Sequence, residues 1–201
     1  MLGPEAGPGM LAVLHYLAAS LDLRASAFEA SIREWERALE LFREGQNRLM
    51  ESAVLAHLSI ALQETGRGQD AVAVLRRAVD LVQDGATPHG LAFALVHLAH
   101  TQLDLGEDDD VGPVLERADE AARRVQNPRC QAWAAWGRAR TALAGGDPAA
   151  ALRECRSAVD LLQDREFPWA LTRLHDLLDH LRSTAPGVGG GVADAGQVTH
   201  G

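Results

Sequence analysis

Apolar side chains recur through most of this chain at the three- and four-residue spacing that places them on one face of an α-helix. The segment from Leu49 to Thr65 shows this spacing most clearly. Its apolar positions are Val54, Leu55, Leu58, Ala61 and Leu62. Gly66 follows directly, and a glycine in the left-handed conformation is a common end to a helix. The pattern therefore predicts an amphipathic helix that ends at Gly66.

A second helix is predicted after each first helix. Beyond Gly66, a new apolar stripe begins near Gln69 and runs through Ala71, Val74, Leu75, Ala78, Leu81 and Val82. In a later segment of the same kind, Asp147 is a candidate N-cap. Pro148 would then take the first helical position, where its missing N–H costs no hydrogen bond. The predicted unit is therefore a pair of helices, a helical hairpin.

The hairpin pattern repeats every 40 residues, and three segments that begin at His57, His97 and Gly137 align without gaps. Their glycines and helix-centre alanines are Gly66, Gly106, Gly146, Ala78, Ala118 and Ala158. A step of 40 back from Ala78 reaches Ala38, which adds a divergent first unit. The four predicted units span about 10–46, 47–86, 87–126 and 127–166. Because one hairpin cannot bury its apolar face alone, we expect the units to stack into a superhelix with a concave inner surface.

The ends of the chain differ from the repeated region. A further amphipathic segment at 168–182 has no partner helix, and we expect it to cap the fourth unit. Residues 1–9 are rich in Gly and Pro, and residues 183–201 are rich in Gly with few large apolar groups. Both are predicted to be flexible tails, the second of them disordered. The prediction is one repeat domain at 10–182 between two tails.

The composition agrees with an all-α fold and narrows the range of partners. Hydrophobic residues make up 47% of the 201 residues, mainly as Ala, Leu and Val, while aromatic residues make up 4%. Ala and Leu are strong helix formers. The net charge of −9 disfavours binding to nucleic acids and to anionic membranes. Neither nucleic acids nor anionic membranes are therefore expected as direct partners.

Targeting signals and cysteine usage predict a cytoplasmic protein. No run approaches about 18 apolar residues, so no membrane span is expected. The first ten residues lack the basic region of a signal peptide. Cys130 and Cys155 are expected to be free thiols in a reducing compartment, because their spacing in the predicted hairpin is too wide for a disulfide.

The repeat resembles a known family. The residues that carry the resemblance to the tetratricopeptide repeat (TPR) are Leu58, Gly66, Ala71, Leu75, Ala78 and Leu81. Units of 40 rather than about 34 residues resemble the helical-repeat arrays of bacterial transcriptional regulators of the LuxR, SARP and helix-turn-helix classes. Over about residues 10–182, the resemblance implies a right-handed superhelical TPR-like solenoid of four helical hairpins plus a C-terminal capping helix. The first helices depart from the consensus because they lack its usual Trp and Tyr.

The resemblance also implies a function and a surface. Such arrays are non-catalytic scaffolds that bind proteins or peptides, here as a regulatory or adaptor module in a bacterium. The alternatives are a small-molecule sensor with an aromatic groove and a structural scaffold that associates with copies of itself. The first helix of each unit lines the inner surface of such an array. Carried over by register, the candidate partner-binding residues are Tyr16, Ile60, Phe93, Val96, His100, Trp133, Trp136 and Arg140.

The candidate residues concentrate large side chains in the third and fourth units. Aromatic groups beside an arginine supply contact area and a directional charge, a common composition of binding hot spots. We interpret this surface as a groove for a peptide or an apolar ligand. The other interpretation, that Phe93 and Trp133 only pack between units, remains open at this point.

Catalytic, cofactor and metal sites are not expected. His97 and His100 can share a helix face, but a zinc site needs three or four ligands, and no further His or Cys is placed to help. Cys155 aligns with the core positions Leu75 and Leu115, so its thiol should be inert. The glycines before Asp147 lack the Gly-Lys-Ser/Thr ending of a phosphate-binding loop. The sequence therefore predicts a binding protein rather than an enzyme.

Overall fold

The protein is described by a computed structural model that covers residues 7–83, 87–107, 111–162 and 179. Over these ranges it is all α-helical, with no strand. The helices are α1 (Pro8–Arg24), α2 (Phe28–Glu44), α3 (Arg48–Glu64), α4 (Gly68–Val82), α5 (Pro88–Asp104), α6 (Val111–Arg124), α7 (Pro128–Ala144) and α8 (Pro148–Leu162). The predicted cap at 168–182, apart from Asp179, and the predicted tail at 183–201 lie outside the described residues, as does most of the tail at 1–9.

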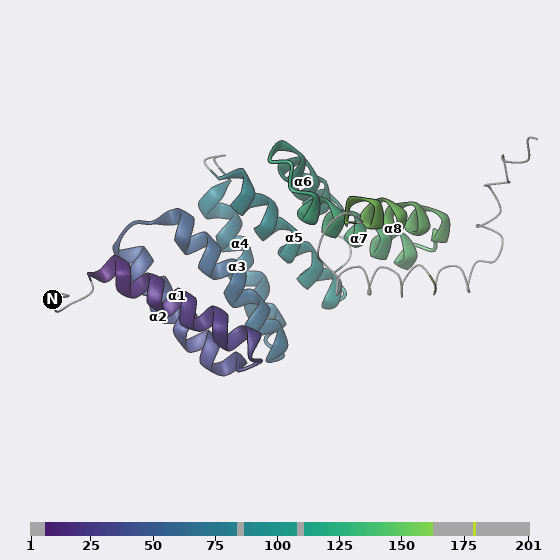
Figure 1. The fold of residues 1–201 in the computed structure, drawn as a ribbon. Helices are drawn as coiled ribbons and strands as arrows, with labels where there is room; N and C mark the ends of the chain where they lie inside the picture. Colours follow the sequence, from purple (N-terminus) through teal and green to yellow (C-terminus); the bar gives the residue numbers. More distant parts are fainter. Residues whose placement is uncertain (1–6, 84–86, 108–110, 163–178, 180–201) are drawn as a thin grey trace, which may run out of the picture.

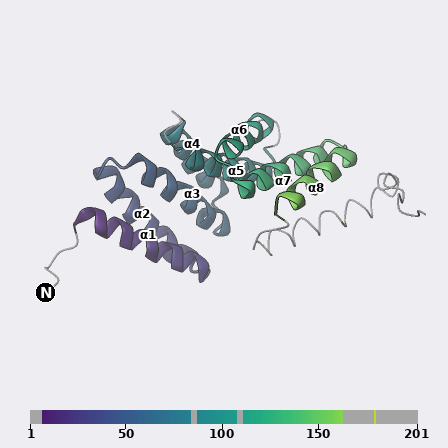
Figure 2. The same cartoon turned by 45° about the horizontal axis from the view of Figure 1, so that its top comes forward.

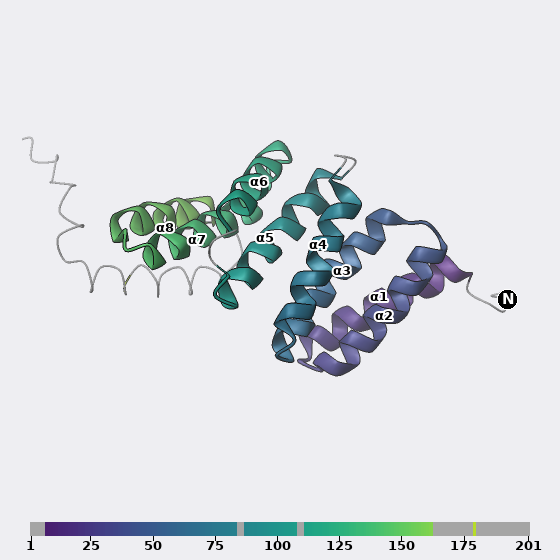
Figure 3. The same ribbon diagram turned by 180° about the vertical axis from the view of Figure 1, so that it is seen from behind.

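The helices form a solenoid of stacked hairpins (Figure 1). The four hairpins are the pairs α1–α2, α3–α4, α5–α6 and α7–α8, and the two helices of each pair pack against one another. Successive hairpins contact each other through α2 and α3, α4 and α5, and α6 and α7. The first helices also contact one another where α3 meets α5 and where α5 meets α7. The views in Figures 2 and 3 agree that the hairpin of α1 and α2 and the hairpin of α7 and α8 occupy opposite ends of the row. The predicted all-α repeat solenoid is confirmed.

A 20-residue period sets the helix boundaries. Seven of the eight helices α1 to α8 in the described ranges begin at residues 8, 28, 48, 68, 88, 128 and 148. The turns between them carry a residue in the left-handed conformation, with φ of 76° at Gly66, 73° at Gly106 and 77° at Gly146. Glycine adopts this conformation without steric cost, so the predicted role of Gly66 as a helix end is confirmed.

Side chains cap three of the helix starts. Asn47, Asn127 and Asp147 each accept a hydrogen bond from the backbone N–H three residues later, at 3.1, 3.2 and 2.8 Å respectively. Each bond satisfies a donor that has no partner within its own helix. The prediction that Asp147 is an N-cap and that Pro148 opens the next helix is therefore confirmed.

The core repeats with the same period as the helices. The alanines at helix centres, Ala38, Ala78, Ala118 and Ala158, are all completely buried. A second buried series, at most 1% exposed, consists of Trp35, Leu55, Leu75, Leu95, Leu115, Ala135 and Cys155. The small residues let helices approach closely while the larger ones fill the space between hairpins. Cys155 lies in the core as predicted.

Helix α7 approaches α6 so closely that a side chain would not fit at Gly137. A Cβ atom added there would lie 2.5 Å from Cδ2 of Leu115. A larger residue at this position would force the buried side chain of Leu115 to shift, so glycine suits this close approach of α7 to α6. None of the helices that the structure describes is both long enough and apolar enough to span a bilayer.

Candidate functional site: a groove along the first helices

The first helices α3, α5 and α7 form an open groove of about 590 Å³. Each helix contributes four side chains to its wall. From α3 these are His57, Ile60, Gln63 and Glu64, from α5 Phe93, His97, His100 and Asp104, and from α7 Arg129, Trp133, Trp136 and Arg140. Residues at equivalent repeat positions, such as Ile60, His100 and Arg140, follow one another along the groove. The 40-residue period therefore builds the site as well as the fold.

Aromatic and imidazole rings form a continuous series across this wall. Ring centroids lie 5.3 Å apart for His57 and Phe93, and 4.3 Å apart for Phe93 and His97. The series continues from His97 to Trp133 at 6.1 Å and from Trp133 to Trp136 at 5.1 Å. Contacts at these distances restrain each ring, so the surface is formed before any ligand arrives.

The rings of Trp133 and Trp136 are only half-buried. Both line the groove, and so does Phe93, which is also half-buried. The interpretation that Phe93 and Trp133 only pack between units therefore does not describe them fully, because each ring has one side against the core and another toward the groove. They offer a ligand apolar area that is already held in place.

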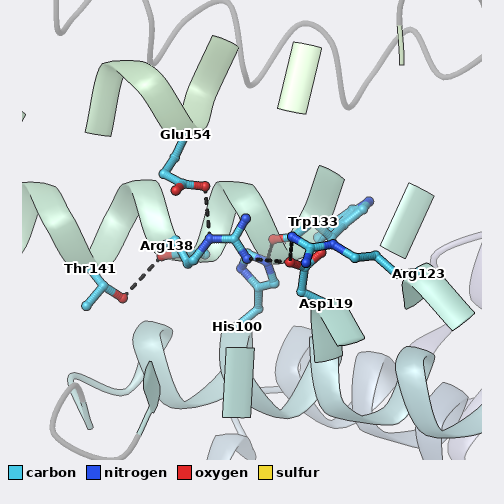
Figure 4. Close-up of polar contacts among 8 residues, drawn as sticks. His100, Asp119, Arg123, Trp133, Arg138, Thr141 and Glu154 are labelled. Carbon is cyan, nitrogen blue, oxygen red and sulfur yellow. Dashed lines mark hydrogen bonds and ion pairs between the residues drawn. The ribbon is translucent and has the colours of Figure 1, made fainter. Parts of the chain in front are cut away.

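His100 joins the two central helices of the groove. Its Nε2 lies 2.9 Å from the backbone oxygen of Trp133. Figure 4 shows this contact. Because a carbonyl oxygen only accepts, Nε2 carries the proton and donates it. The other ring nitrogen, Nδ1, faces Nη1 of Arg140 at 3.5 Å as an acceptor. Burial, together with the nearby charge of Arg140, lowers the pKa of His100 from 6.5 to about 4, so the ring is neutral at pH 7.

The other two imidazoles of the groove are neutral for the same main reason. Burial, followed by the neighbouring His100, lowers the pKa of His97 to about 3. Burial also lowers the pKa of His57, whose Nδ1 donates to the backbone oxygen of Ala53 at 2.8 Å. Since Nδ1 of His57 carries the proton, its Nε2 is an acceptor. The groove therefore presents imidazoles as polar, uncharged groups.

The charged groups of the groove are balanced in number. Two carboxylates, Glu64 and Asp104, and two guanidinium groups, Arg129 and Arg140, line it. Nη2 of Arg140 lies 2.7 Å from Oδ1 of Asp104, and its guanidinium carbon lies 6.0 Å from the centre of the Trp136 ring. Arg140 is thus held in an ion pair and over an aromatic face. A ligand carboxylate would have to compete with Asp104 for it.

A network of ion pairs holds α7 between its neighbours (Figure 4). The buried Asp119 of α6 accepts from Arg123 at 2.6 Å and from Arg138 of α7 at 3.5 Å. Arg138 also donates to Glu154 of α8 at 2.9 Å. Arg138 lies two residues before Arg140 and five after Trp133, which places it on a different side of α7 from these two groove residues. Its ion pairs therefore hold α7 in place without occupying the groove.

Six of the eight predicted site residues line the groove, and two do not. The six are Ile60, Phe93, His100, Trp133, Trp136 and Arg140. Val96 is only 3% exposed and belongs to the core, so its place on the binding surface was predicted wrongly. Tyr16 lies outside this groove, half-buried with its ring 4.9 Å from Trp35 and 5.9 Å from His57. It continues the ring series toward α1.

From the sequence, His97 was weighed only as a metal ligand, and His57, Glu64 and Arg129 were not selected as site residues. The signal that could have found the two histidines is their spacing, since each lies three residues before Ile60 or His100 and thus shares that helix face. Within the described ranges, no group of three or more metal-ligating side chains occurs. The free thiols Cys130 and Cys155 are buried, which raises the pKa of each to about 11.

No protein-family model matches the sequence, and no curated protein matches it either. Solved structures do match. BtubC from P. vanneervenii has a TM-score of 0.75 at 15% identity, over 90% of this chain and 77% of its own. A Rap protein complexed with competence and sporulation factor has a TM-score of 0.77 at 13% identity, over 90% of this chain. The match covers 51% of the Rap chain, so this chain spans about half its length.

MamA from Desulfovibrio magneticus RS-1 has the same kind of fold, with a TM-score of 0.57 at 19% identity, over 89% of this chain and 87% of its own. Sequence identity in all three matches is low, so the likeness is one of fold. It shows that this chain is a TPR-type helical-repeat solenoid.

Proposed function

We propose that this protein is a non-catalytic scaffold that binds a protein or peptide partner in the groove of α3, α5 and α7. The observation that carries the proposal is the series of half-exposed rings along this groove, because preformed aromatic area at the floor of a concave surface is what a binding hot spot requires. The Rap structure supports it, since a solenoid of similar fold occurs there in a complex with competence and sporulation factor.

The chemistry of the groove favours an extended peptide with a large aromatic or aliphatic anchor. Phe93, Trp133 and Trp136 offer the apolar contact area. The neutral rings of His57 and His97 and the amide of Gln63 are positioned to pair with polar groups of a peptide backbone. Because carboxylates and guanidiniums are equal in number, the affinity should depend only weakly on salt, unlike that of a site for nucleic acid.

The test is to select linear peptides from a displayed random library and to titrate the enriched peptides by calorimetry. We expect enriched peptides to share an aromatic or large aliphatic anchor. Trp136→Ala should weaken their binding by about 2 kcal/mol or more, the scale of a hot spot. Leu49→Ala is the matched control, because Leu49 is 48% exposed and lies outside the groove.

Two results would contradict this function. One is a library that yields no enriched peptide, and the other is binding that Trp136→Ala leaves unchanged. Far-UV circular dichroism of each variant checks that the helices are intact, so that a loss of binding is not a loss of fold.

A second candidate function is the sensing of a small apolar molecule. The observation that favours it is the groove volume of about 590 Å³, which falls within the range of roughly 300–1,000 Å³ for ligand pockets. A thermal-shift screen of metabolites distinguishes the two functions. Stabilisation by a small molecule that Trp133→Ala abolishes, with no enriched peptide, would favour the sensor.

The 40-residue repeats support a more specific setting for either function. We propose that the chain serves as the sensing or docking module of a bacterial regulatory system in the cytoplasm, as its resemblance to regulator arrays implies. A non-catalytic role agrees with the high pKa of the thiols of Cys130 and Cys155, which leaves neither poised to act as a nucleophile at neutral pH.

A further inference from the structure

Helix α1 carries most of the large apolar side chains that are exposed on the described part of the chain. Six of the eight lie on it, namely Met10, Leu11, Val13, Leu14, Leu17 and Leu21. Met10, Leu14, Leu17 and Leu21 are 60%, 51%, 52% and 68% exposed. Their spacing of four, three and four residues places them in one stripe along the helix. An exposed apolar stripe of this kind marks an interaction surface.

The repeat shows what this surface accepts. Leu14 and Leu21 are equivalent to Val54 and Ala61 of α3, which are completely buried. In α5 the equivalent positions are also at most 1% exposed. Helices α3 and α5 each pack against the second helix of the preceding hairpin, whereas no described helix precedes α1. Leu14 and Leu21 therefore occupy positions that a neighbouring helix covers in the later hairpins, whereas Leu17 is equivalent to the groove residues His57 and His97.

The opposite side of α1 is already occupied by α2. Ala12 and Ala19 are completely buried, and the hydroxyl of Ser31 in α2 donates to the backbone oxygen of Ala19 at 3.0 Å. The stripe lies on the side of α1 opposite these contacts with α2. Helix α1 itself belongs to the hairpin at one end of the row (Figure 1). A helix could dock on it without displacing any described contact.

We propose that the occupant is α1 of a second copy of this chain, packed antiparallel about a two-fold axis. The four-three-four spacing is that of a coiled-coil seam, and the flanking positions Leu11, Val13 and Ala18 carry no charge that would repel an identical helix. Antiparallel packing sets Met10 opposite the partner's Leu21 and Leu14 opposite the partner's Leu17. Parallel packing would instead bring Asp22 near its own copy.

The area available on α1 reaches the size that such a dimer needs. Full coverage of the four stripe residues together with the flanking Leu11 and Val13 would bury at most about 600 Å² per copy, or about 1,200 Å² per pair, the lower end of the range for specific interfaces. The described residues that line the groove lie on α3, α5 and α7 and not on α1, so contact between two α1 helices leaves the groove open. Each dimer then presents two grooves, and a partner with two anchors gains affinity by binding both.

Analytical ultracentrifugation of the full chain over a range of concentrations tests the dimer. We expect the wild-type protein to sediment at twice its chain mass of 21.5 kDa. The double variant Leu14→Glu and Leu21→Glu should sediment as a monomer, with the dimer Kd raised about a hundredfold or more. Leu49→Glu, at a residue of similar exposure on α3, should remain dimeric. Because all three substituted residues are about half exposed or more, far-UV circular dichroism should show an unchanged helix content.

Disulfide cross-linking tests the antiparallel arrangement. Cys130 and Cys155 are buried, so a thiol introduced on α1 can be oxidised selectively. A mixture of Leu14→Cys and Leu17→Cys chains should form mixed disulfides more readily than either variant forms them alone. A wild-type monomer at every concentration, a dimer that survives the two Glu substitutions, or preferential cross-linking of Leu14→Cys to itself would each overturn the proposal. None of these outcomes depends on the groove or its ligand.

Discussion

This fold should lose stability at pH values well above those at which carboxylates become protonated, because His100 is buried in its neutral form. In the unfolded chain a histidine titrates near pH 6.5, whereas in the fold the pKa of His100 is about 4. Between these values the unfolded state binds a proton that the folded state does not. The stability is therefore complete above pH 6.5 and is lost as the pH falls toward 4.

The magnitude follows from the size of that difference. Each pH unit within the window costs about 1.4 kcal/mol per histidine, so a change from pH 7 to pH 5 should remove about 2 kcal/mol through His100. His97, with a pKa of about 3, adds to the loss in the same direction, but by less than its full shift because its side chain is partly exposed. The carboxyl of Glu34, whose pKa is lowered from 4.5 by its hydrogen bond to His15, loses its stabilising contribution only as the pH falls below that ordinary value, and so below the interval from pH 7 to pH 5.

Urea denaturation at pH 5, 6, 7 and 8 measures the effect. The variant His100→Gln keeps an amide donor for the backbone oxygen of Trp133 and removes the titrating group, so its stability should change with pH by about 2 kcal/mol less than that of the wild type. His89→Gln, at an exposed residue, is the matched control. Equal wild-type stability at pH 5 and pH 7, or an acid sensitivity that His100→Gln leaves intact, would refute the assignment of a buried neutral ring.

Two further predictions concern the packing of the repeats. Ala118→Leu should lower the free energy of unfolding by roughly 1–3 kcal/mol, because the larger side chain overpacks a completely buried helix crossing. Ala73→Leu, at an exposed position, is the control and should cause no such loss; equal melting temperatures for the two variants would count against the crossing. Gly137→Ala should also cost roughly 1–3 kcal/mol of stability, because its Cβ would meet Leu115. In thermal unfolding, the double variant Gly137→Ala and Leu115→Ala should lose less stability than the two single variants lose in sum; simple additivity would show that the two residues do not meet.

Much of this fold could be predicted from the sequence because one period governs every level of it. The 40-residue recurrence of Gly66, Gly106 and Gly146 marks turns that need a left-handed residue, and the recurrence of Ala78 and Ala118 marks close helix crossings. A regular repeat leaves few alternative arrangements for the hairpins. The stacking of hairpins into an all-α solenoid therefore followed from the spacing of the repeat.

The details of the groove could not be predicted in the same way. Val96 shares a helix face with Phe93 and His100, but it is only 3% exposed and belongs to the core. The equivalent residue of α7, Trp136, is half-exposed and lines the groove. The ion pair of Arg140 with Asp104 joins residues on different helices. Such contacts depend on the distance between helices, which the hydrophobic pattern does not contain.

The 20-residue period of the helix starts has a consequence for how this molecule can change in length. Removal of residues 48–87, which include α3 and α4, would place Pro88 directly after the turn at Asn47, where Arg48 now stands. Every later helix would keep its direction and its place as the first or second helix of a hairpin. Removal of a single helix would reverse the direction of all that follow. Duplication or loss by recombination is therefore tolerated only in whole hairpins. Each of the first helices α3, α5 and α7 contributes four side chains to the wall, so the reach of the groove can grow or shrink only in steps of that size.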